Sequence, residues 1–240
     1  MTLSGQRVVV VGGTSGMGLA TVRAAAAQGA YVVAAGHRPI AGRESIDGVA
    51  QARVDLTDEA SVRALFDGVG QVNHVFVSAS PGSAGPLLEQ DLAAARSFLD
   101  GKFLGSWACA RYAAPRMPAG GSITFVTGCA VIRPPRNAAM VTAAFAAVEA
   151  LSRALAVELG PVRVNTIRPG YTDSEMWSGL PDAERERLRR RVAEALPSGR
   201  MGTPEDIAHA AIFLMTSRQT TGAVLEVSGG ESLVDSLEER

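Results

Sequence analysis

Closely spaced glycines follow a run of valines near the N-terminus, in a pattern typical of phosphate binding. Val8 to Val11 lead into Gly12-Gly13-Thr14-Ser15-Gly16-Met17-Gly18, and a helical pattern starts at Leu19. Glycines at a strand-to-helix turn let the backbone bend tightly and approach a pyrophosphate, whose charge lies over the helix N-terminus. A tight turn without a ligand would show the same glycines, so residues elsewhere must decide. The predicted contacts are Gly12, Thr14, Ser15, Gly16, Met17 and Gly18.

Further motifs follow in chain order and favour the ligand. They are Asp55-Leu56-Thr57, Arg163-Val164-Asn165 with Arg168-Pro169-Gly170, Gly199 to Ala208, and Thr221-Gly222 through Gly229-Gly230. Together with the glycine spacing, they make the chain resemble the short-chain dehydrogenase/reductase family from end to end. The resemblance implies an α/β fold, a single-domain Rossmann fold with a seven-stranded, doubly wound parallel sheet and helices on both faces.

The resemblance also implies which other residues contact the cofactor. Asp55 would contact the adenine amino group, and the backbone amide of Leu56 would face the adenine ring. Pro169 and Gly170 would form the turn near the nicotinamide. The remaining implied contacts lie after other strands, on Ser78, Ala79, Ser80, Thr127, Thr172 and Ser174.

Residues at the end of the second predicted strand indicate which cofactor binds. Gly36, followed by His37 and Arg38, stands where members that prefer NAD carry an acidic residue for the ribose hydroxyls. A guanidinium suits a 2′-phosphate, and the missing carboxylate removes a repulsion against it. NADP(H) is therefore favoured over NAD(H), with His37 and Arg38 as contacts. A solvated surface position for Arg38 is the alternative.

The family's catalytic Asn, Ser, Tyr and Lys are replaced in this chain. The segment Ala146 to Leu151 resembles the residues directly after the family's Lys, which places Phe145 at the Lys position and Val141 at the Tyr position. The same comparison puts Gly128 at the Ser position and Lys102 at the Asn position. Val and Phe carry no proton donor, so neither can protonate an alkoxide. Ordinary ketone reduction by the family's route is therefore disfavoured.

Lys102 and Tyr171 are the candidates for replacing the lost acid. Lys102 is the single lysine among 23 basic residues, and apolar surroundings would lower its pKa so that it could act as acid, base or imine-forming amine. A snorkelling surface lysine is the competing interpretation. Tyr171 could donate a proton or form a wall of the pocket. Cys129 is expected to be a buried structural cysteine.

The elements that position these residues follow from Val- and Ile-rich runs that alternate with helical patterns, as in a parallel sheet covered by helices. Strands are predicted near 7–11, 31–35, 51–54, 73–77, 122–127, 162–167 and 223–227. Helices are predicted over 16–28, 58–67, 89–113, 139–159, 182–195 and 205–216. Turn-forming residues in 36–50 make a full crossover helix there doubtful. Residues 1–240 are expected to form one domain, with a substrate lid at about 173–196.

Composition favours small-molecule chemistry or protein contacts. Apolar residues make up 47% of the chain, charged residues 20%, and the formal net charge is −1, which indicates neither nucleic-acid nor membrane binding. Cys109 and Cys129 lack metal-ligand spacing, so no metal is expected, and the low cysteine content fits a reducing, cytoplasmic compartment. The alanine-rich helix 139–159 allows close approach of another helix, so a homodimer or homotetramer is expected.

Three functions remain open. The first is an NADP(H)-dependent oxidoreductase that acts on a small, partly hydrophobic substrate with an atypical proton source. Conjugated double bonds are suitable substrates because the negative charge delocalises after hydride addition. The second is a non-redox cyclase, lyase or isomerase on the same scaffold. The third is a non-catalytic NADP(H)-binding sensor or partner subunit.

Overall fold

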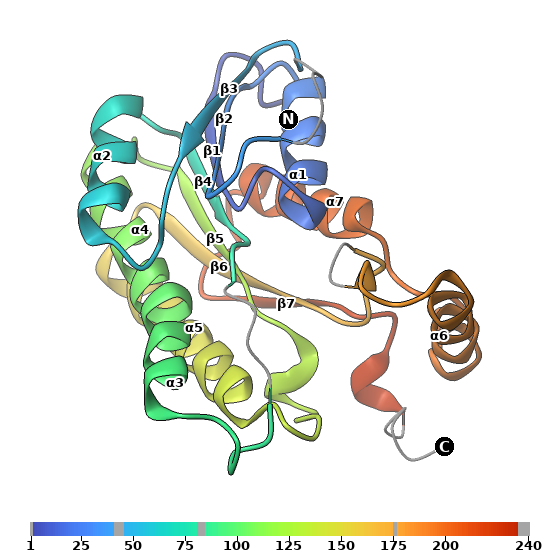
Figure 1. Cartoon of the computed structure of the whole chain (residues 1–240). Helices are drawn as coiled ribbons and strands as arrows, with labels where there is room; N and C mark the ends of the chain where they lie inside the picture. Colours follow the sequence, from blue (N-terminus) through green and yellow to red (C-terminus); the bar gives the residue numbers. More distant parts are fainter. Residues whose placement is uncertain (1, 41–45, 81–84, 175–176, 235–240) are drawn as a thin grey trace.

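A single sheet of seven parallel strands forms the centre of the molecule (Figure 1). The computed structural model describes residues 2–40, 46–80, 85–174 and 177–234. The strands are β1 Arg7–Val11, β2 Tyr31–Gly36, β3 Val49–Arg53, β4 His74–Val77, β5 Ser122–Val126, β6 Arg163–Pro169 and β7 Val224–Val227. Their order across the sheet is β3-β2-β1-β4-β5-β6-β7. The predicted doubly wound Rossmann fold is confirmed.

Helices cover both faces of the sheet (Figure 1). The longer helices are α1 Gly16–Ala27, α2 Glu59–Val69, α3 Leu92–Leu99, α4 Gly105–Ala113, α5 Ala139–Glu158, α6 Asp182–Ala195 and α7 Pro204–Thr216. The short turns used below are η1 Asp100–Leu104, η3 Cys129–Val131 and η5 Glu231–Leu233. Helices α1 and α7 pack together on one face, and α2 and α4 pack together on the other, which α5 also covers.

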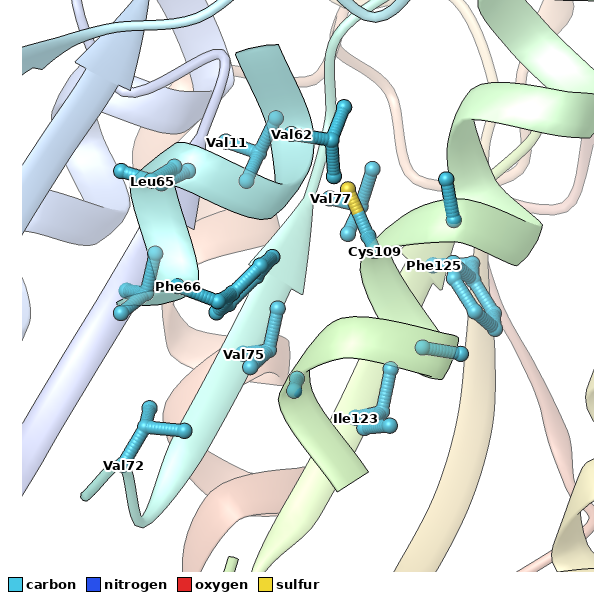
Figure 2. Packing of buried hydrophobic residues seen from close by; sticks show 14 of the residues in the cluster. Val11, Val62, Leu65, Phe66, Val72, Val75, Val77, Cys109, Ile123 and Phe125 are labelled. Atoms are coloured by element: carbon cyan, nitrogen blue, oxygen red, sulfur yellow. The ribbon is translucent and has the colours of Figure 1, made fainter. Parts of the chain in front are cut away.

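Strand β1 shows why two layers of helices are needed. Val8 and Val10 belong to the core under α1 and α7, whereas Val9 and Val11 belong to the core under α2 and α4. Successive side chains of a strand point to opposite faces, so a strand buried on both sides is apolar at every position. Figure 2 shows the second core, which Val11 enters from the sheet.

The predicted helix 89–113 is divided into three parts. Its first part is α3, which begins after Asp91, whose carboxylate accepts a hydrogen bond from the Ala94 N–H at 2.7 Å. The π-helical turn η1 follows, and α4 continues the helix. Apolar residues run through all three parts, so sequence periodicity could not reveal the wider turn. The π turn contains Lys102 and leaves it buried.

Strand β3 begins two residues earlier than predicted, at Val49, and ends at Arg53. It ends before Asp55 because the Asp55 carboxylate accepts hydrogen bonds from the Thr57 N–H and hydroxyl, which fold the chain into a turn. Between β2 and β3, the described residues 37–40 and 46–48 contain no helix, as expected from their turn formers. Residues 41–45 lie outside the described part.

Candidate active site

The order in which strands are added to the sheet reverses between β1 and β4, since β2 and β3 lie on one side of β1 and the later strands lie on the other. Ligands of doubly wound folds bind at the carboxyl ends of the strands at this point. Gly12 and Ala79 follow β1 and β4, respectively. A Cβ placed on Gly12 would lie 2.6 Å from the Ala79 backbone nitrogen, and one on Gly18 would collide with the Gly12 carbonyl oxygen. The two glycines therefore allow the turn, the neighbouring loop and α1 to pack closely.

The N-terminus of α1 fits an anion. Ser15 occupies the N-cap position without forming a side-chain capping hydrogen bond, and the first turn contains no acidic residue. The backbone N–H groups of this turn therefore keep their partial positive charge for a ligand. Gly16 has a φ of +48°, and among the described residues a Cβ there would meet Ser174 alone, at 3.9 Å. The helix N-terminus therefore has the chemistry that a pyrophosphate requires.

The ends of β2 and β3 form the adenosine side of the predicted site. Gly36 lies against Thr14, since an added Cβ would be 2.6 Å from the Thr14 hydroxyl oxygen. His37 and Arg38 extend beyond it and are exposed. The hydrogen bonds from Thr57 lower the pKa of Asp55, which keeps its carboxylate ionised. The structure thus brings the glycine turn and the residues after β2 together.

Lys102 is fixed in the wall beneath the site. It is 1% exposed, and its Nζ donates hydrogen bonds to the carbonyl oxygens of Val126 at 2.6 Å and Ala79 at 3.3 Å. The Phe145 ring centroid lies 5.2 Å from Nζ, within cation–π range. Burial lowers the Lys102 pKa to about 7. The side chain therefore links the ends of β4 and β5 and is no snorkelling surface lysine.

Phe145 and Gly128 pack against each other at two of the positions where the sequence comparison predicts replaced catalytic residues. A Cβ on Gly128 would lie 3.0 Å from Cε2 of Phe145, so the ring occupies the space next to the glycine. The same Cβ would lie 3.9 Å from the Pro169 carbonyl oxygen. The residue types at the two positions are thus physically coupled, and Gly128 lies close to the turn that follows β6.

The turn after β6 connects the site to the predicted lid. The Thr172 hydroxyl donates to the Gly170 carbonyl at 3.0 Å, and the Tyr171 and Trp177 rings stack with centroids 6.2 Å apart. Trp177 Nε1 donates to the Thr172 carbonyl at 2.9 Å. Tyr171 and Trp177 also pack against the apolar cluster under α6 that contains Val192. The Tyr171 ring is thus packed between the turn after β6 and α6.

Two arginines of α6 bind one carboxylate of this turn. Arg185 donates to Asp173 Oδ1 from Nε at 3.1 Å and from Nη2 at 2.6 Å, while Arg189 Nε donates to Oδ2 at 2.8 Å. Both arginines act with these hydrogen bonds to lower the Asp173 pKa, although its partial burial opposes them. Helix α6, within the predicted lid, is therefore held electrostatically to the turn after β6.

A buried polar network behind the site was missed by the sequence reasoning. Arg168 forms a bidentate pair with Glu149, through distances of 3.0 and 2.7 Å, and Thr127 donates to Glu149 at 3.0 Å. Arg168 also lies 3.5 Å from Glu226. An acidic residue inside a long apolar run of α5 and an arginine near the end of the apolar strand β6 were the signals that could have revealed it.

Cys129 and His74 have structural environments. Cys129 is buried, and burial raises its pKa to about 12, so it remains a neutral thiol, as expected for a structural cysteine. His74 bonds Ser122 at 2.8 Å and Gln6 at 2.6 Å at the opposite edge of the sheet. Burial lowers its pKa to about 4. Neither group is an acid for the site at neutral pH.

Comparison with known proteins identifies the family. The family model described as enoyl-(acyl carrier protein) reductase matches residues 11–232. The short-chain dehydrogenase/reductase ATR9 of Stachybotrys chlorohalonatus is 31% identical, with 97% of this chain and 99% of that protein covered. A solved small-chain dehydrogenase in complex with NADPH is 31% identical with a TM-score of 0.80, and the alignment covers 95% and 99% of the two chains. The MalC reductase/Diels-Alderase of Malbranchea aurantiaca is 26% identical with a TM-score of 0.86, covering 96% of each chain. The chain therefore belongs to the short-chain dehydrogenase/reductase family.

Proposed function

We propose that this protein is an NADP(H)-dependent oxidoreductase that reduces a small, partly hydrophobic substrate without the family's Tyr–Lys pair. The uncapped N-terminus of α1, beside Gly12 and Gly16, carries the proposal, because the backbone N–H groups of its first turn can bind a phosphate anion. Arg38 is exposed just after the end of β2, which carries no carboxylate, and its guanidinium favours a cofactor with a 2′-phosphate over one without it. The NADPH held by a relative of 31% identity supports the same choice.

An extended dinucleotide would cross the carboxyl edge of the sheet. Its adenosine half would lie by Asp55 and Arg38, and its nicotinamide half would lie over the ends of β4, β5 and β6, near Thr127 and Gly170. When bound, NADPH supplies a hydride. Residues of the chain then have to orient the substrate, exclude water and deliver any proton.

The apolar replacements favour substrates that need little help from an acid. Val141 and Phe145 cannot protonate an alkoxide, whereas a conjugated double bond spreads the charge left by hydride addition. We assign Lys102 to electrostatic support, because its ammonium already donates to the Val126 and Ala79 carbonyls. It is the proposed cationic partner of the anion that forms above it.

Calorimetric titration with NADPH, NADH and their oxidised forms tests the proposal. We expect NADPH to bind at least 10-fold more tightly than NADH, and Arg38→Ala to remove most of that preference. Arg23→Ala, on α1, is the matched control and should keep the preference. Absence of binding by all four nucleotides would contradict the proposed function.

A non-redox reaction in the same pocket is the second candidate. The solved relative described as a reductase/Diels-Alderase supports it, because that description joins a reduction to a cyclisation. Substrate conversion at equal rate with NADPH and NADP⁺ would favour this function, whereas conversion tied to NADPH oxidation would favour the first.

A further inference from the structure

Glu231 lies beside the turn that follows β6. Its Oε2 accepts a hydrogen bond from the Tyr171 backbone N–H at 2.8 Å, and a Cβ on Gly170 would collide with the same oxygen. Glu231 opens η5 directly after Gly230, whose φ of +86° favours glycine. A partly buried carboxyl group is thereby placed at the carboxyl edge of the sheet, against the Gly170–Tyr171 backbone.

Charged and titratable groups from several elements act on this carboxyl. Glu226 of β7 repels it, and Arg133 of the loop after η3 attracts it. The Cys129 thiol of η3 lies within electrostatic reach. Among the described residues, Glu231 forms no ion pair. Burial, the largest effect, and Glu226 raise the pKa of Glu231 above its usual value of 4.5, so it keeps a proton at higher pH than an ordinary carboxyl group.

The other polar groups around the turn are weaker candidates for proton transfer. Lys102 directs Nζ to two backbone carbonyls under the Phe145 ring. Cys129 has a pKa raised to about 12, which makes its thiol a poor acid at neutral pH. Glu149 is held in a bidentate pair with Arg168. Glu231 combines a titratable carboxyl, partial burial and contact with the turn after β6.

We infer that Glu231 is the proton donor of the reduction, an inference that rests on the proposed function. As the acceptor carbon gains the hydride, its π bond breaks and the electron pair moves to the conjugated atom at the other end. Glu231 gives its proton to that atom: the carboxyl O–H bond breaks, a new bond to hydrogen forms on the product, and a carboxylate remains. Water returns the proton before the next turnover.

Proton release during cofactor binding tests this role without a substrate. NADP⁺ carries a positive ring that NADPH lacks, so a nearby Glu231 should lose more of its proton when NADP⁺ binds. Calorimetry at about pH 6, in two buffers of different ionisation enthalpy, gives the protons released by each nucleotide. We expect more release with NADP⁺ than with NADPH, and loss of this difference in Glu231→Gln. The amide of Gln can still accept the Tyr171 hydrogen bond, so the fold should be retained.

Matched variants identify the titrating group. Glu205→Gln changes an exposed carboxylate of α7 and should leave the difference intact. The comparison is made in a Lys102→Met background, which removes the other buried group that titrates near neutral pH. If the difference persists in Glu231→Gln in that background, the inference is wrong.

Turnover supplies a second, separate readout. With cinnamaldehyde as a conjugated probe, Glu231→Gln should lower the rate of NADPH oxidation about 10²-fold, and Glu231→Asp should recover part of the loss. Equal rates in wild type and Glu231→Gln would overturn the inference. Wild type that binds NADPH but reduces no conjugated acceptor would contradict the proposed function instead, while the calorimetric result would still decide whether Glu231 exchanges a proton at the site.

Discussion

At the scale of single residues, the packing of the Phe145 ring against Gly128 predicts how the chain responds to a larger side chain at position 128. We expect Gly128→Ser to lower the free energy of unfolding by about 1–3 kcal/mol, because the new Cβ lies too close to the ring and forces it from its position. Denaturant unfolding measures the change. Gly179→Ser, where a Cβ would meet nothing within 4 Å, is the control. Equal stability of Gly128→Ser and wild type would contradict the crowding seen here.

Lys102 predicts how stability changes with pH. Its pKa is about 7 in the folded protein against an ordinary 10.5, so between these values the unfolded chain binds more protons. The free energy of unfolding should therefore rise with pH above about 7. The buried cysteines act in the opposite sense above about pH 9, so the window for measurement is pH 7 to 9.

Lys102→Met should remove this rise, since methionine fills similar volume without a proton. Denaturant unfolding at several pH values measures the slope in both proteins. The same slope in wild type and variant would show that the folded ammonium keeps an ordinary pKa, stabilised by its carbonyl partners.

At the scale of elements, Asp173 and its two arginines hold α6, the helix of the predicted lid, against the turn after β6. Asp173→Asn removes the negative charge to which both guanidinium groups bind, and it leaves the side-chain volume nearly unchanged. We expect amide hydrogen exchange in α6 to accelerate by a factor of about 5, close to 1 kcal/mol, because these ion pairs are partly exposed. Asp182→Asn, at the start of α6, is the control. Unchanged exchange in Asp173→Asn would show that apolar packing alone holds the lid.

The elements themselves could largely be predicted from sequence. All seven strands were predicted. The central strands β1, β4, β5 and β6 are buried apolar runs with few other interpretations, whereas the edge strand β3 is largely exposed and its start was misplaced by two residues. The π turn at Lys102 was not predictable, since one wide turn leaves the apolar pattern unbroken. Glu231 was missed for a different reason: its position against Tyr171 depends on a contact between residues 60 positions apart.

At the scale of the whole molecule, α5 presents surface that the single chain does not cover. The helix is long and apolar enough, by length and composition alone, to cross a membrane. Its inner face packs on β6 and carries the buried Glu149. The helix is therefore one of those that cover a face of the sheet. Its outer face exposes small side chains, on Ala143, Ala146, Ala150 and Ala154.

We expect a second copy of the chain to pack on this outer face. Ala150→Arg should then shift sedimentation toward a smaller species, because a long charged side chain prevents close approach of two helices. Arg190→Ala, on the lid helix, serves as the control. A single-chain mass for the wild type would contradict the predicted homodimer or homotetramer.

The packing of Phe145 against Gly128 also couples the residue types that these two positions can carry. A serine at 128 would meet the ring, and a lysine at 145 would bring a second cation toward Lys102. Gly128→Ser and Phe145→Lys are therefore each expected to cost stability unless the other position changes as well, so the substitutions that these two positions accept should be paired rather than independent.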